Sequence, residues 1–171
     1  MRTVVLGCGN LLIPRDSVGI HVVRELLSRE LPDWVTVTEA GTPGLAILDM
    51  MEGYDRAIIV DAVQAGGRAG EVYRFTGSDI PPVKEAPLSM HGFSLAEALQ
   101  LGRRLGVPMP REIIIIGVEI GVDPPPEDML PGPGGLDGVP EDMRQGVTLA
   151  VELVLEELER GDRGGSRSAG G

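Results

Sequence analysis

Two carboxylates and one imidazole occur at widely separated points of the chain, each beside a predicted strand or helix: Asp16, Asp61 and His91. Carboxylate oxygens together with a neutral imidazole nitrogen are a sufficient ligand set for a divalent transition metal. Three protein ligands would leave coordination positions for a substrate or a water molecule. The alternative is that all three residues have structural roles. Asp16 could cap the first helix, Asp61 could cap a turn, and His91 could form a hydrogen bond with a loop. Whether the three residues form one site depends on the elements that carry them.

Those elements alternate between strand-like and helix-like apolar patterns. We expect strands over 3–8, 34–39, 56–60, 71–75 and 112–118, and helices over 18–30, 43–51, 94–105 and 142–159. Such alternation predicts a mostly parallel sheet with helices on both faces, that is, a single three-layer α/β/α sandwich. We expect this domain to span residues 1–160, followed by a disordered Gly/Ser/Arg tail over 161–171.

In sheets of this kind, ligands bind outside the carboxyl ends of the strands. This rule selects polar groups and turns from five segments: Gly9, Asn10 and Asp16; Glu39 and the turn Gly41-Thr42-Pro43-Gly44; Asp61; His91 and Gly92; and Glu119. The glycines of the turn are expected to let a backbone approach closely. Residues 122–140 are rich in Pro and Gly, and a loop of this length is expected to be available to a partner.

The segment Gly7-Cys8-Gly9 begins like a dinucleotide-binding fingerprint. Leu12 stands where the third glycine would be, and Pro14 lies between this segment and the first predicted helix. The glycines are therefore expected to allow a sharp turn and not to cradle a nucleotide. Cys8 is expected to be a buried strand residue and not a nucleophile, since strand interiors bury cysteine readily.

The composition excludes several classes of partner. The 171 residues carry a net charge of −11, which disfavours binding to phosphate backbones and to anionic membrane surfaces. Cys8 is the single cysteine, so no internal disulfide can form, as is usual in a reducing compartment. No apolar run is long enough to cross a bilayer, and the chain starts directly on a predicted strand without a signal peptide. A cytoplasmic location is expected.

Several motifs in a fixed order resemble the hydrogenase maturation endopeptidases. These motifs are Gly7-x-Gly9-Asn10, Asp16, Gly19, Gly41-Thr42-Pro43-Gly44, Val60-Asp61-Ala62 and His91-Gly92. The resemblance runs from Arg2 to about Ile120 and implies a phosphorylase- or flavodoxin-like α/β sandwich. This fold agrees with the one expected from the alternation of elements.

The resemblance implies an enzyme that removes the C-terminal extension of a nickel–iron hydrogenase large-subunit precursor. Asp16, Asp61 and His91 would be the metal-contacting and catalytic residues, and the turn over 41–44 would bind substrate. The nickel would arrive with the precursor, so the free enzyme would be empty of metal. No nucleic acid or membrane would take part, and the enzyme would be a monomer.

The first loop departs from the family pattern, which often has two consecutive acids followed by a glycine. Arg15 replaces the first acid and Ser17 replaces that glycine, so Arg15 is expected to alter substrate contacts. Three alternatives stay open at this point. They are a nickel-binding chaperone or docking module that does not cleave, a nucleotide- or flavin-binding domain, and a small hydrolase that uses Cys8.

Overall fold

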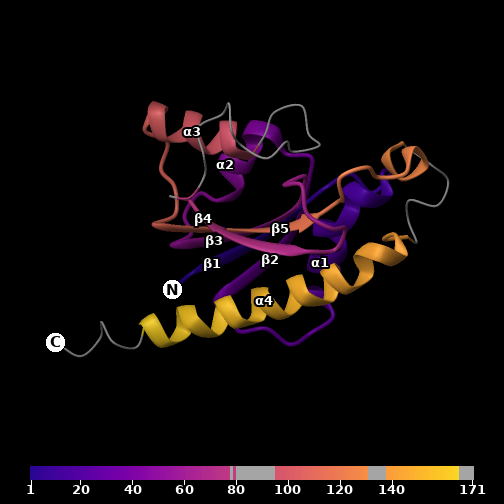
Figure 1. Cartoon of the computed structure of the whole chain (residues 1–171). Coiled ribbons are helices and arrows are strands. Elements are labelled where there is room, and N and C mark those ends of the chain that lie inside the picture. Colours follow the sequence, from indigo (N-terminus) through magenta and orange to yellow (C-terminus); the bar gives the residue numbers. More distant parts are fainter. Residues whose placement is uncertain (78, 80–94, 131–137, 166–171) are drawn as a thin grey trace.

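One five-stranded sheet organises the protein in our computed structural model, which describes all residues except 78, 80–94, 131–137 and 166–171 (Figure 1). The strands are β1 (Thr3–Cys8), β2 (Val35–Gly41), β3 (Arg56–Val63), β4 (Val72–Thr76) and β5 (Glu112–Glu119). Their order in the sheet is β2-β1-β3-β5-β4, and only β4 is antiparallel to its neighbour. The prediction of a mostly parallel sheet is confirmed.

Helices cover both faces of this sheet. They are α1 (Val18–Leu27), α2 (Ile47–Met50), α3 (Leu95–Leu105) and α4 (Glu141–Gly165), with 3-10 turns η1 (Pro14–Ser17), η2 (Gly44–Ala46) and η3 (Pro126–Met129). The helices α1 and α4 lie on one face, and α2 and α3 lie on the other (Figure 1). The three-layer α/β/α sandwich is therefore confirmed.

The strands read as continuous apolar runs because both of their faces are buried. Alternate side chains enter different cores, as period-two geometry requires. Ile58 and Ile114 pack with α1 and α4, whereas Ile59 and Ile113 pack with α2 and α3. This alternation decides on which side of the sheet each residue at a strand end lies.

Several boundaries differ from those expected. The strand β3 continues to Val63 because it pairs with β5 beyond residue 60, so Asp61 lies within the strand and not after it. The helix expected over 43–51 begins as the 3-10 turn η2 and is regular only over Ile47–Met50. The helix α1 ends at Leu27 and not at residue 30.

The last helix is longer than expected. The helix α4 continues to Gly165, so the tail expected to begin at 161 is wrong for 161–165, and 166–171 lie outside the described residues. The loop expected over 122–140 contains η3, and its residues 131–137 also lie outside the described part. No helix in the described part of the chain is both long enough and apolar enough to span a membrane.

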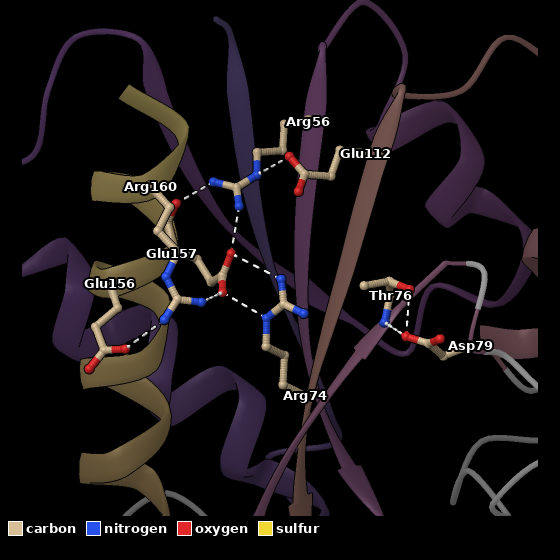
Figure 2. Close-up of polar contacts among 8 residues, drawn as sticks. All are labelled: Arg56, Arg74, Thr76, Asp79, Glu112, Glu156, Glu157 and Arg160. Atoms are coloured by element: carbon tan, nitrogen blue, oxygen red, sulfur yellow. Dashed lines mark hydrogen bonds and ion pairs between the residues drawn. The ribbon is translucent and has the colours of Figure 1, made fainter. Parts of the chain in front are cut away.

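A group of ion pairs joins α4 to the amino-terminal edge of the sheet (Figure 2). Arg56 is 1% exposed, and its guanidinium pairs with Glu157 at 2.6 Å and with Glu112 at 2.7 Å. The Nε of Arg74 donates to Glu157 at 2.7 Å, and Arg160 donates to the same carboxylate at 2.9 Å. These charges lie at the end of the sheet opposite to the one at which ligands are expected.

Candidate active site

Asp16 lies in the short turn η1, between the end of β1 and the start of α1. The turn is closed by the Asp16 N–H, which donates to the carbonyl of Ile13 at 3.0 Å. The side chain is 1% exposed, and its Oδ2 accepts the N–H of Asn10 at 2.8 Å. A Cβ at Gly9 would lie 2.1 Å from the carbonyl oxygen of Asp16, so a glycine is needed there for the turn to pack on β1.

The start of α1 packs equally closely on the strands. A Cβ at Gly19 would lie 2.2 Å from the carbonyl oxygen of Cys8 and 2.4 Å from that of Val60. A Cβ at Gly7 would lie 2.2 Å from the carbonyl oxygen of Gly19. The glycines of the first motif therefore bring α1 and the Asp16 turn against β1 and β3, and the expected role in a sharp, tightly packed turn is supported.

Asp61 lies near the carboxyl end of β3, on the face covered by α2 and α3. It is 4% exposed, and its Oδ1 accepts the N–H of Ala62 at 2.9 Å. On one side its neighbour in the sheet is Gly117 of β5, which has no side chain. On the other side Val60 pairs with Gly7, so Asp61 and Cys8 are the next residues along these two neighbouring strands.

Electrostatics connect both carboxylates with the same thiol. Burial, the Asp61 charge and the Asp16 charge, in that order, raise the pKa of Cys8 well above its ordinary value. Asp16 and Asp61 lie in separate segments, and the charges of both raise the pKa of the same thiol at the end of β1. The thiol stays protonated at neutral pH, and since the thiolate is the nucleophilic form, this disfavours a hydrolase that uses Cys8.

The turn over 41–44 adjoins this region, because the N–H of Gly9 donates to the carbonyl of Gly41 at 2.8 Å. Gly41 and Gly44 have φ values of +63° and +52°. Residues that carry a Cβ rarely adopt this backbone conformation. Among the described residues, nothing lies within 4 Å of a Cβ built at either position. The backbone conformation explains both glycines, and no described residue fills the space beside them.

Two other acidic residues selected from the sequence, Glu119 and Glu39, form contacts with other parts of the chain. Glu119 is fully buried and accepts the N–H of Ala65 at 2.7 Å and that of Gly121 at 3.0 Å, so it fixes the two connections around it. Glu39 is exposed and forms an ion pair with Arg24 of α1 at 2.8 Å. Both contacts are structural.

His91 and Gly92 lie outside the described residues, so the structure does not place the expected imidazole. Within the described part of the chain, no group of three His, Cys, Asp or Glu side chains is arranged to hold a metal. The described donors are thus the two buried carboxylates, Asp16 and Asp61. Carboxylate oxygens suit a divalent cation when a further ligand completes the set.

Arg15 is 3% exposed, and its side chain is engaged by other parts of the chain. Its guanidinium donates to the carbonyl of Ile120 at 2.9 Å, to Asp128 at 3.2 Å and to Asp142 at 2.9 Å. These contacts give Arg15 a role within the fold, and its expected effect on substrate contacts stays a prediction. Its partners are 105 to 127 residues away in sequence, so no local pattern could have revealed them.

A three-layer α/β domain with buried carboxylates near the carboxyl ends of its parallel strands is the architecture of an enzyme whose site lies at that edge. Comparison with known proteins gives the class. The chain belongs to the hydrogenase maturation protease family, because the family model HycI, "Hydrogenase maturation protease", matches residues 20–126. It is a peptidase of this family.

Curated relatives agree over most of the chain. It is 32% identical over 139 residues to the hydrogenase 2 maturation protease of Escherichia coli K12, covering 76% of this chain and 84% of that protein. It is 31% identical over 166 residues to the coenzyme F420 hydrogenase subunit delta of Methanothermobacter thermautotrophicus, covering 91% and 93%.

Solved structures agree on the fold. The hydrogenase maturating endopeptidase HybD from E. coli is similar with a TM-score of 0.76 and 29% identity, covering 94% of both chains. The [NiFe] hydrogenase maturation protease HybD from Thermococcus kodakarensis is similar with a TM-score of 0.65 and 25% identity, covering 91% of this chain and 98% of that one.

Proposed function

We propose that this peptidase removes the C-terminal extension of a nickel–iron hydrogenase large-subunit precursor that already carries nickel. The observation that carries the proposal is the pair of buried carboxylates, Asp16 and Asp61, that act on one point at the end of β1 in a chain of this family. The names of similar proteins, a [NiFe] hydrogenase maturation protease among them, support the class of substrate.

In this proposal Asp16, Asp61 and His91 are the catalytic residues and contact the nickel that the precursor brings. A bound metal ion polarises a carbonyl group and lowers the pKa of a bound water molecule. The chain's own carboxylates supply negative charge that favours a docked cation. The η1 turn and β3 hold these carboxylates in place before the precursor binds.

The turn over 41–44 receives the peptide to be cleaved. Thr42 is exposed, and no described residue occupies the space beside Gly41 and Gly44, which would leave room for an extended backbone. We further propose that the enzyme acts as a cytoplasmic monomer built on one domain. Its net charge of −11 disfavours nucleic acid and anionic membranes as partners.

The experiment compares variants on nickel-loaded and nickel-free precursor, with cleavage read by mass. Asp16→Asn, Asp61→Asn and His91→Ala should each abolish cleavage, because each removes one of three ligands. Asp33→Asn, which changes an exposed carboxylate, is the matched control and should cleave like the wild type.

Circular dichroism checks that all four variants are folded. Full cleavage by the three site variants would contradict the assignment and return these residues to structural roles. Tight binding of the precursor by the wild type without any cleavage would favour the nickel-binding chaperone or docking module instead.

A further inference from the structure

Arg15 is next to Asp16 in the chain, yet its side chain extends to a different part of the molecule. It contacts three separate segments, namely the residue after β5, the turn η3 and the first turn of α4. Asp16, by contrast, accepts the N–H of Asn10, in the loop after β1. The η1 turn, four residues long, is therefore held on two sides by two consecutive side chains.

The contacts of Arg15 use the shape of its guanidinium. Nη1 donates to the carbonyl of Ile120, Nε donates to Asp128, and Nη2 donates to Asp142. A lysine has one compact ammonium group and cannot present donors in this fixed planar arrangement. The contacts therefore specify arginine and not merely a positive charge.

Arg15 forms ion pairs with two aspartates, Asp128 and Asp142. Its side chain is 4% exposed, whereas those of Asp128 and Asp142 are 25% and 51% exposed. An acid at position 15, as the resemblance led us to expect, would face two carboxylates without a cation between them. In this chain the arginine at position 15 supplies that cation.

We propose that Arg15 is a positioning residue for Asp16. It fixes η1 against the end of β5, against η3 and against the start of α4, so the placement of the Asp16 carboxylate depends on these three segments. This inference rests on the proposed function for its catalytic consequence, but not for its structural one. The contacts of Arg15 that carry this inference all lie within the chain.

The test uses Arg15→Gln, with Arg15→Lys as the conservative variant and Arg56→Gln as a matched control. Arg56 is also buried and ion-paired, but it lies at the opposite edge of the sheet. Two quantities are measured on the full chain below the melting temperature of every variant. They are amide hydrogen exchange over residues 10–17 and kcat/KM for nickel-loaded precursor per folded enzyme.

For Arg15→Gln we expect exchange over residues 10–17 about tenfold faster, because the turn opens more often. We expect kcat/KM to fall about 10- to 100-fold, as when a residue that orients a ligand is lost. For Arg15→Lys, both the exchange over residues 10–17 and kcat/KM should lie between the values for Arg15→Gln and the wild type. Arg56→Gln should lower the melting temperature and leave both quantities at their wild-type values.

The proposal is overturned if Arg15→Gln lowers only the melting temperature and leaves both exchange over 10–17 and kcat/KM unchanged. If the wild type does not cleave the precursor, the proposed function fails, and exchange alone decides whether Arg15 positions the turn. If Arg15→Gln does not fold, Asp128→Asn and Asp142→Asn each remove one partner. Wild-type exchange over 10–17 in both would overturn the proposal, and faster exchange would support it.

Discussion

Replacing Glu157 by glutamine should destabilise the protein strongly, although the side chain keeps its shape. The carboxylate is 1% exposed and accepts bonds from Arg56, Arg74 and Arg160 at 2.6, 2.7 and 2.9 Å. Glutamine retains one acceptor oxygen and turns an NH₂ group toward the arginines. Breaking a buried ion pair on one side costs about 3–5 kcal/mol. Here the buried guanidinium of Arg56 would keep only one carboxylate partner among the described residues, the half-exposed Glu112.

For a domain of this size, each kcal/mol lowers the melting temperature by about 2–4 °C, so a fall of about 6–20 °C is expected. The assay is thermal unfolding at pH 7, followed by circular dichroism. Glu156→Gln is the matched control on the same helix, because Glu156 is 61% exposed and pairs with Arg160 only at 3.5 Å. It should cost less than about 1 kcal/mol.

The difference between Glu157→Gln and the wild type should shrink in acid. Burial by itself would raise the pKa of Glu157, but the hydrogen bond from Arg74 and the arginine charges outweigh it and lower the pKa. The stabilisation is therefore complete above the ordinary pKa of a glutamate and is lost as the pH falls through the lowered value. Equal melting temperatures for Glu157→Gln and Glu156→Gln at pH 7 would refute this reasoning.

Four further changes test other parts of the structure. Gly19→Ala should destabilise the protein by about 3 kcal/mol or more in chemical denaturation, because its Cβ would lie 2.2 Å from a backbone oxygen. Cys8→Ala should retain cleavage, and loss of activity with an intact fold would revive the thiol as a nucleophile. Gly41→Ala should cost about 1–2 kcal/mol from its positive φ, and a fall in kcat/KM that remains after correction for the folded fraction would support the peptide-binding turn. Truncation after Gly165 should change neither the melting temperature nor cleavage, and a change in either would give residues 166–171 a role.

The layers of the fold could be predicted because both signals involved are local. Apolar runs such as 112–118 indicate strands buried on both faces, and the alternation with helices indicates a parallel sheet. The end of β3 could not be predicted, because Asp61 is polar and belongs to the strand only through pairing with Gly117. The extension of α4 to Gly165 was missed because its last turns contain glycines, which are poor helix formers.

Part of the candidate site could also be predicted, because the ends of predicted strands are local features of the sequence. The rule that ligands bind at carboxyl edges selected Asp16 and Asp61, and it also selected Glu119 and Glu39. Sequence cannot separate these two pairs, because the separation depends on partners such as the Ala65 N–H and Arg24. The role of Arg15 depends entirely on contacts made across the fold.

The close packing of Gly7, Gly9 and Gly19 has a consequence for how relatives are recognised. At each of these positions a backbone oxygen lies within about 2.4 Å of the place that a Cβ would take. Only glycine therefore fits there, whatever reaction the protein performs. A search that weights them heavily will find chains that share the architecture, including any that have lost catalysis. If Asp16 and Asp61 are catalytic as proposed, divergence of activity would show first at these two residues, whose replacement leaves the glycine spacing intact. Inactive descendants of this family should therefore be recognisable as sequences with all three glycines and without the two carboxylates.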